Sequence, residues 1–125
     1  MKKKIFLKRF KGKKIIITGH TGLKGSWLSL WLNHLGANVY GISNNFNIKK
    51  TNIKNFRMKK NIKNFNIDIR NFEKLNKIVK KIKPDFIFHF AAQALVGSSY
   101  KDPIYNFETN FNGTLNLLEV LRLSN

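Results

Sequence analysis

Short apolar runs alternate with stretches of helical periodicity along most of this chain. The run Ile15–Ile17 is continuous and β-branched, which predicts a strand covered on both faces of a parallel sheet. The segment 61–67 alternates between polar and apolar residues except at Lys63-Asn64, which is typical of an edge strand. The predicted elements are strand 14–18, helix 23–35, strand 37–42, strand 61–67, helix 72–82, strand 85–90 and helix 104–122.

The helices are predicted from their apolar spacing and from signals at their ends. Gly36 is a natural C-terminal cap of the first helix, Asn71 an N-terminal cap of the second, and Pro84 ends the second. Each helix carries an apolar set, expected to face the core in the first two helices and to share one face in the third. The sets are Leu23, Trp27, Leu30, Trp31 and Leu35; Phe72, Leu75, Ile78, Val79 and Ile82; and Phe107, Phe111, Leu115, Leu118 and Leu121.

The order of these elements predicts the fold class. Strands that alternate with helices form α/β folds with parallel sheets. We expect the first half of a Rossmann-type, doubly wound parallel sheet, with helices on both faces and the strand order 3-2-1-4. The segments 43–60 and 94–103 are predicted loops, the first of them with room for a short helical piece.

A glycine turn follows the first strand. Gly19, Gly22 and Gly25 recur at every third position between a predicted strand and a predicted helix. Gly19 would supply a positive φ in the tight turn, Gly22 would let a diphosphate approach the helix N-terminus, and Gly25 would let the helix pack closely on the strand. This spacing predicts a dinucleotide site. The alternative is a strand–turn–helix that binds no ligand.

Length and composition restrict the class of protein. The chain has 125 residues, enough for one domain with a core, and no cysteine, which excludes disulfides and thiolate metal sites. The basic start at Met1–Phe10 has only three apolar residues between its charges, and no apolar run is long enough to span a bilayer. We therefore expect a cytoplasmic protein without a membrane partner.

The net charge of +18 suggests nucleic-acid binding, but the kind of basic residue argues against it. Only four of the 24 basic residues are arginine: Arg9, Arg57, Arg70 and Arg122. The lysines are scattered among Asn, Ile and Phe, all encoded by A/T-rich codons, so that a biased genome explains them. Specific readers of nucleic acids rely on arginine. We expect no specific nucleic-acid partner.

Several segments resemble one enzyme family. Residues 18–28, with Lys24 before the third glycine and Ser26-Trp27-Leu28 after it, resemble the signature of CDP-glucose 4,6-dehydratases. These enzymes are extended short-chain dehydrogenase/reductases that act on nucleotide sugars. The similarity covers nearly the whole chain except residues 44–60. The further matching segments are 10–13, 68–70, 88–93, Ser99-Tyr100 with Pro103, and 109–119.

The resemblance implies NAD as the cofactor and gives roles to matching residues. The backbone of the glycine turn would hold the diphosphate, Asp68 and Ile69 would flank the adenine, and the segment 91–93 would line the nicotinamide ribose. Asp68 alternatively only ends a strand, Asn110 only braces the fourth strand, and His89 is expected to be a packed strand residue. The implied cofactor-binding residues are Gly19, Thr21, Gly22, Leu23, Lys24, Gly25, Ser43, Asp68, Ile69, Ala91, Ala92, Gln93 and Asn110.

The sequence departs from the family pattern in two places. NAD enzymes often have an acidic residue after the second strand, whereas Ser43-Asn44-Asn45 stand here, so that NAD over NADP rests on the resemblance alone. The family's chemistry also requires a Ser/Thr and a Tyr-x-x-x-Lys pair. No lysine stands four residues after any tyrosine of this chain, which are Tyr40, Tyr100 and Tyr105.

These observations predict the N-terminal portion of an NAD-binding domain over residues 1–125, without the sugar-binding C-terminal domain. The chain is expected to be a fragment, a truncated reading frame or one piece of a split protein. The whole protein is expected to dehydrate CDP-glucose in polysaccharide biosynthesis, and the chain alone to be inactive. The alternatives are another epimerase or dehydratase of the family, a GDP-mannose type included, and a noncatalytic NAD-binding module. A nucleotide sugar is the expected partner, and a homodimer is common among relatives.

Overall fold

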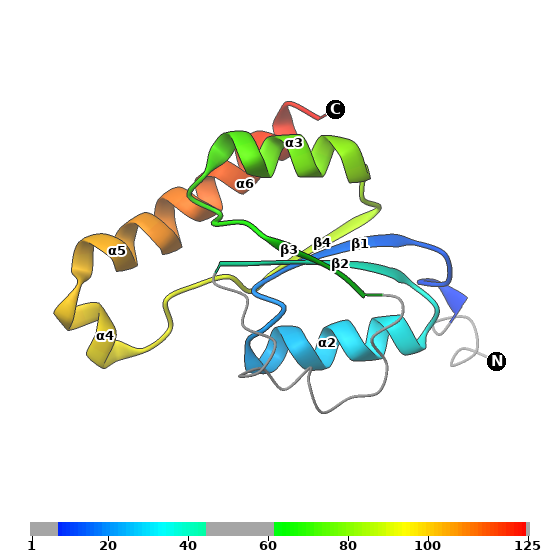
Figure 1. The fold of residues 1–125 in the computed structure, drawn as a ribbon, viewed down its shortest axis with the longest axis horizontal. Coiled ribbons are helices and arrows are strands. Elements are labelled where there is room, and N and C mark those ends of the chain that lie inside the picture. The colour runs from blue at the N-terminus through cyan, green and yellow to red at the C-terminus, as the bar shows by residue number, and fades with distance from the viewer. Residues whose placement is uncertain (1–7, 45–61, 125) are drawn as a thin grey trace.

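A computed structural model describes residues 8–44 and 62–124 of the chain (Figure 1). The long predicted loop over 43–60 therefore lies, except for its first two residues, outside the described residues. The elements are β1 Lys14–Thr18, α2 Leu23–His34, β2 Asn38–Ser43, β3 Ile62–Asn66, α3 Phe72–Ile82, β4 Phe86–His89, α4 Val96–Lys101, α5 Pro103–Phe107, the π-helical turn η4 Glu108–Asn112, and α6 Gly113–Arg122.

The four strands form one parallel sheet in the order β3-β2-β1-β4, which confirms the predicted fold class and strand order. Strand β1 is central because Ile15 pairs with Val39 of β2 and with Phe86 of β4. Figure 1 shows α2 on one face of the sheet, and α3 and α6 on the other. All carboxyl ends of the strands consequently lie at one edge of the sheet, where open α/β folds bind ligands.

The core has two halves, one on each face of the sheet. Successive β1 side chains point to opposite faces, so that Ile15 and Ile17 pack under α2 while Ile16 packs under α3 and α6. All three isoleucines are fully buried. The expected inward set of α3 is confirmed, because Leu75 and Val79 are among its buried residues. A β-branched strand buried on both faces thus anchors the sheet, as the apolar run predicts.

The predicted core-facing stripe of α2 is right for Leu30, which is buried in the core, and wrong for three of its other members. Leu23, Trp27 and Trp31 are 68%, 58% and 48% exposed. The side of α2 that faces the sheet instead carries small residues beside two leucines, and buried serine hydroxyls are satisfied within the helix, as in the bond from Ser29 Oγ to the Gly25 carbonyl (2.7 Å). Small side chains let the helix axis approach the sheet closely. The buried residues of α2 are Gly25, Ser26, Ser29, Leu30 and Leu32.

The C-terminal region differs from the prediction in two ways. The predicted loop over 94–103 contains the short helix α4, and the predicted helix over 104–122 is interrupted by η4. The apolar set predicted for that helix is largely exposed, with Phe111 and Leu118 at 55% and 59%. The buried side carries Gly113, where a Cβ would overlap the Ile69 side chain, together with Leu117 and Val120. Close approach again depends on a glycine.

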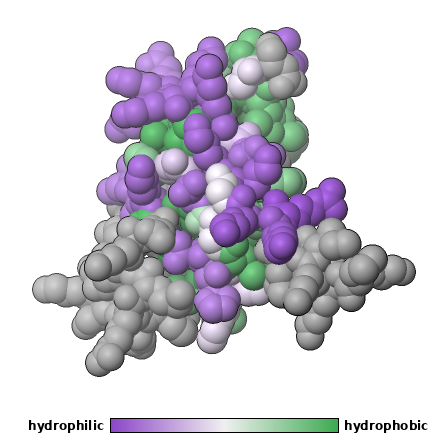
Figure 2. Space-filling model, turned by 90° about the vertical axis from the view of Figure 1, so that its right-hand side faces the viewer, coloured by the Kyte–Doolittle hydropathy of each residue, from purple (hydrophilic) through white to green (hydrophobic). Residues whose placement is uncertain are grey.

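The ends of α3 follow the sequence signals. Asn71 Oδ1 accepts a hydrogen bond from the Lys74 amide (3.0 Å), as expected of an N-terminal cap. Lys83 ends the helix in a left-handed conformation with φ 51°. No helix in the described ranges is long and apolar enough to cross a membrane. Figure 2 shows hydrophilic residues over much of one side of the molecule, with hydrophobic residues between them.

Candidate functional site

The glycine turn joins β1 to α2 and lies against the end of β4. Gly19 has φ 70°, and a Cβ on it would lie 2.6 Å from the Ala91 amide nitrogen. A Cβ on Gly25 would overlap the Gly19 carbonyl. Both positions therefore require glycine for conformation or close approach, as the sequence predicts. The turn brings the N-terminus of α2 to the carboxyl edge of the sheet.

The N-terminus of α2 is free of side-chain caps. Gly22 occupies the cap position with an extended backbone, there is no side-chain cap hydrogen bond, and the first turn contains no acidic residue. Such amide groups carry partial positive charge and are a common site for phosphate. A Cβ on Gly22 would lie 3.3 Å from the Gly19 carbonyl oxygen, a tight contact rather than an overlap. The fold alone therefore does not require glycine at position 22, whereas a ligand that approaches the helix N-terminus would.

Two cavities flank the turn and share Gly19, Gly22 and the segment 90–92. The first, about 210 Å³, extends toward the ends of β2 and β3, and the second, about 560 Å³, toward β4 and α6. Every predicted site residue lines one or both of these cavities. Predicted residues of the first cavity are Gly19, Thr21, Gly22, Ser43, Asp68, Ile69, Ala91, Ala92 and Gln93. The second adds Leu23, Lys24, Gly25 and Asn110.

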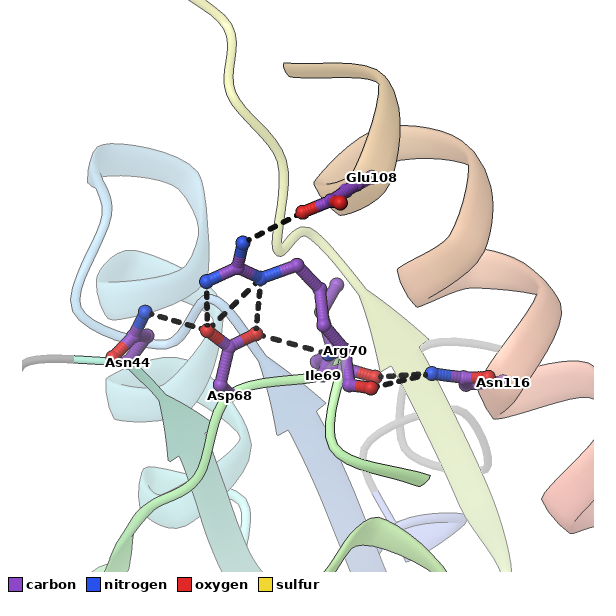
Figure 3. Close-up of polar contacts among 6 residues, drawn as sticks. All are labelled: Asn44, Asp68, Ile69, Arg70, Glu108 and Asn116. Carbon is purple, nitrogen blue, oxygen red and sulfur yellow. Dashed lines mark hydrogen bonds and ion pairs between the residues drawn. The ribbon is translucent and has the colours of Figure 1, made fainter. Parts of the chain in front are cut away.

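Asp68 lies at the centre of a charged cluster beside the first cavity (Figure 3). Arg70 donates from Nη2 to Asp68 Oδ2 (2.7 Å) and from its backbone amide to Asp68 Oδ1 (2.9 Å). Asn44 Nδ2 also donates to Asp68 Oδ2 (2.9 Å). The hydrogen bonds from Arg70 lower the pKa of Asp68 below its ordinary value, against the effect of partial burial. These neighbours thus keep the Asp68 carboxylate ionised and fix its orientation.

The Arg70 guanidinium is itself held from three sides. Its Nη1 donates to Glu108 Oε2 (3.1 Å) on η4, its other nitrogens bind Asp68, and its Cζ atom lies 4.4 Å from the centre of the Tyr105 ring. Asn116 of α6 fixes the backbone at the same turn by donating to the Ile69 and Arg70 carbonyls (3.1 and 3.0 Å; Figure 3). Arg70 was not predicted as a site residue. Its position directly after Asp68-Ile69 is the only feature of the sequence that could have indicated it.

A buried histidine lies behind the same cavity. His20, in the glycine turn, is fully buried; its Nε2 lies 2.8 Å from Asn64 Oδ1 and its Nδ1 2.9 Å from Ser43 Oγ. Ser43 Oγ in turn lies 3.1 Å from Thr21 Oγ1. Burial lowers the pKa of His20, while hydrogen bonds to the Ile42 backbone and Asn64 oppose this effect. A Cβ on Gly41 would overlap the ring, so that this glycine makes room for His20.

The second cavity has a comparable hydrogen-bonded support. His89 joins β1 to α6, with Nδ1 2.6 Å from Thr18 Oγ1 and Nε2 3.0 Å from Thr114 Oγ1. Asn110 clamps the Gln93 backbone, accepting from its amide (2.8 Å) and donating to its carbonyl (3.1 Å). His89 is a packed strand residue, as the sequence predicts. Asn110 braces the segment that follows β4, and its implied contact with the cofactor stays a prediction.

Thr109 is a cavity residue that sequence reasoning missed. It is 7% exposed and lines the first cavity, and its hydroxyl has no hydrogen-bond partner among the described residues. A buried hydroxyl without a partner costs free energy, and a ligand donor or acceptor would remove that cost. Thr109 lies in η4, where the π-helical register shifts which residues face inward. An α-helical period could not have selected it.

Comparison with known proteins gives the family. The profile described as GDP-mannose 4,6 dehydratase matches residues 16–125. The chain is 42% identical over 113 residues to a CDP-glucose 4,6-dehydratase of Salmonella typhimurium, covering 90% of this chain and 32% of that protein. It is 32% identical over 119 residues to a GDP-mannose 4,6-dehydratase of Vibrio cholerae, covering 89% and 32%. The chain spans about a third of the length of these curated relatives.

Solved structures give the same fold. An epimerase of Methanothermobacter thermautotrophicus superposes with a TM-score of 0.82 at 30% identity, covering 94% of this chain and 34% of that one. A UDP-glucose 4-epimerase of Thermus thermophilus, solved in complex with NAD, gives 0.76 at 32% identity and covers 89% and 34%. Since the profile match runs from β1 through the glycine turn to the end of α6, the chain belongs to the GDP-mannose 4,6-dehydratase family.

Proposed function

We propose that this chain is the NAD-binding part of a nucleotide-sugar 4,6-dehydratase whose substrate is CDP-glucose. The observation that carries the proposal is the uncapped N-terminus of α2, with cavities on both sides of it and all predicted site residues around them. A dinucleotide needs such a central diphosphate site with room for one nucleotide on each side. The choice of CDP-glucose rests on the 42% identity to the Salmonella enzyme.

The residues present fit NAD. The amides of the α2 first turn would hold the diphosphate without interference from a Cβ at Gly22. Ile69, which is buried beside the first cavity, would pack on the adenine. The segment 91–93, held in place by Asn110, would line the nicotinamide ribose. When bound, NAD would take a hydride from the sugar and return it.

The Asp68 cluster qualifies the expected contact with the adenine amine. Both carboxylate oxygens already accept hydrogen bonds, from Arg70 and Asn44. The adenine amine would therefore replace Asn44, the uncharged donor, while Arg70 keeps the carboxylate ionised. Thr109 would supply the second polar contact of this cavity. In this arrangement the protein holds the base by one carboxylate, one hydroxyl and one aliphatic side chain.

Catalysis belongs to the whole protein in this proposal. The sequence has no lysine four residues after any tyrosine, so that the 125 residues would bind NAD but not turn over a sugar. Residues 1–125 would form the N-terminal portion of the NAD-binding domain. Its cytoplasmic location and the homodimer remain predictions.

The test is NAD binding by the 125-residue chain, measured by calorimetry and by the rise of the melting temperature with added NAD. Gly22→Val would block the diphosphate and abolish binding. Gly97→Val is the matched control, because Gly97 lies in α4 with open space around it and outside the site. The proposal is contradicted if the unaltered chain does not bind NAD, or if Gly22→Val binds it as well as the control does.

An epimerase is the second candidate, favoured by the two solved structures named above. Both reactions use the same cofactor site, so the chain itself does not distinguish them. The whole protein would be incubated with CDP-glucose, GDP-mannose and UDP-glucose in turn. Formation of a 4-keto-6-deoxy product from CDP-glucose supports the proposal, whereas an epimeric product without loss of water supports the alternative.

A further inference from the structure

A separate cavity, here called the α3 cavity, lies between α3 and the sheet. It measures about 280 Å³ and shares no lining residue with the two cavities beside the glycine turn. Lys14, which lines it, begins β1, whereas the glycine turn follows the other end of that strand. The α3 cavity is therefore distinct from the site proposed for NAD. Its lining residues are Lys14, Tyr40, Lys63, Phe65, Ile78, Lys81 and Ile82.

Three lysines from three different elements surround the α3 cavity. They are Lys14 of β1, Lys63 of β3 and Lys81 in the last turn of α3. No acidic residue lines the cavity, and none of these lysines forms a salt bridge within the part of the chain that the structure describes. The Asp85 carboxylate is bound by the Lys13 ammonium and the Lys14 backbone amide (3.0 and 2.8 Å). A concave surface lined by one sign of charge attracts the opposite charge, here an anion.

Two of the three ammonium groups are held in place by the protein. Lys14 Nζ donates one of its three protons to the Ile82 carbonyl (3.1 Å), and Lys63 Nζ lies 5.5 Å from the centre of the Tyr40 ring. Both contacts leave protons for a further acceptor. Because these side chains are already ordered, a ligand would lose less free energy in fixing them. They differ in this respect from lysines that extend into solvent without a contact.

The α3 cavity also has an apolar wall. The rings of Tyr40 and Phe65 stack with their centres 6.4 Å apart and their planes at 18°. Ile78 and Ile82 add aliphatic surface from α3. Such a wall can contact the organic part of a ligand while the lysines bind its anionic group. The volume of about 280 Å³ suits one small molecule.

We propose that the α3 cavity is a second ligand site, which binds a small organic phosphate with an aromatic or other apolar part. Three ammonium groups fit a phosphate monoester, whose charge near neutral pH is about −1.5 to −2, better than a carboxylate of single charge. Lysine binds phosphate as a point charge with rotatable donors. Tyr40 and Phe65 would contact the organic part. This site does not depend on the proposed NAD-binding function.

The test titrates the 125-residue chain with phenyl phosphate and follows the chemical shifts of the backbone amides. We expect saturable shifts at Tyr40, Lys63 and Lys81, whether or not the glycine turn also responds. Inorganic phosphate and phenol should each bind the cavity more weakly, because each has only one part of the ligand. Shifts confined to residues 19–25 would place the probe at the N-terminus of α2 and overturn the proposal. Inorganic phosphate that binds as tightly as phenyl phosphate would overturn the role of the apolar wall.

Two double variants separate local contacts from the general attraction of a basic protein. Lys63→Gln with Lys81→Gln removes two ammonium groups from the cavity, and we expect binding of phenyl phosphate to weaken about tenfold. Lys74→Gln with Lys77→Gln, on α3 but outside the cavity, lowers the net charge equally and should change binding by less than about twofold at physiological salt. Equal losses in the two variants overturn the proposal. A single-stranded octanucleotide that shifts the same amides at lower concentration than phenyl phosphate assigns the surface to nucleic acid instead, which also overturns it.

Discussion

The Thr109 hydroxyl gives a prediction with opposite signs for folding and binding. Thr109→Val keeps the side-chain shape and removes a buried hydroxyl without a partner among the described residues. We expect the chain without ligand to gain about 1 kcal/mol in the free energy of unfolding, because the desolvation cost disappears. NAD binding would weaken in the same variant. Urea unfolding and calorimetry check the two effects, and a variant of lower stability with unchanged affinity would contradict both.

The site residues that could be identified from the sequence differ in their contacts from those that could not. Gly19 and Gly25 were identifiable because local turn geometry sets their backbone roles. Arg70 and His20 were not, because their partners Glu108 and Asn64 lie 38 and 44 residues away in sequence. Such pairs form only when separate elements meet at the sheet edge. Long-range polar contacts are thus the part of this site that needed a structure.

The buried histidines predict how stability depends on pH. Burial lowers the pKa of His20 and of His89 below the ordinary value of 6.5. Between the folded and unfolded pKa values the unfolded chain binds more protons, so the free energy of unfolding decreases as the pH falls below about 6.5. Above that pH both states are neutral at these rings and the contribution vanishes.

Urea unfolding between about pH 5 and 8 measures this dependence. H20Q removes one of the two titrating rings and should flatten the curve over the same range. A stability that is constant through this range, or that rises on acidification, would contradict neutral burial of the two histidines.

At the scale of elements, the sequence was informative about which segments are helical or extended, and less so about which face is buried. Apolar runs and spacing predicted all four strands and two of the helices within a residue or two. Most of the buried face of α2 was misjudged, and the buried face of α6 was not predicted, because both helices approach the sheet or a neighbouring side chain through Gly25, Ser29 and Gly113. Hydrophobicity cannot distinguish a small buried residue from an exposed one.

Helix α2 therefore should resist enlargement on its small-residue face. Ser29→Leu would be forced against the sheet, and we expect a loss of about 1–3 kcal/mol in the free energy of unfolding. Ser29→Ala should cost much less, since it removes only a bond within the helix. Thermal or urea unfolding of both variants gives the comparison, and equal stability of the two would show that α2 is not closely packed at this position.

At the scale of the whole molecule, net charge and exposed apolar surface have opposite effects on self-association. A net charge of +18 favours solubility, while the side of α5, η4 and α6 that carries Phe107, Phe111, Leu115 and Leu118 is more than half exposed at each of these residues. Apolar residues adjacent in space favour association when they lie uncovered.

We expect the 125-residue chain to self-associate, increasingly so at high salt, where its charges are screened. The double variant Phe111→Lys, Leu118→Lys should remain monomeric in sedimentation at the same concentration. A double variant with the substitutions Lys77→Glu and Lys80→Glu on α3 controls for altered charge. Equal association of the unaltered chain and the Phe111/Leu118 variant would exclude this surface as the cause.

The central position of β1 has a consequence for the order in which the protein forms during synthesis. Its neighbour β2 follows within the next turn and helix, but its other neighbour, β4, pairs with it through residues such as Thr18 and His89, which are 71 apart in sequence. While the ribosome is still translating that interval, one edge of β1 has no partner, and closing so long a loop is slow and entropically costly. The glycine turn and the first βαβ unit can therefore assemble early. The second cavity, which His89 lines, can form only after residue 89 has left the exit tunnel.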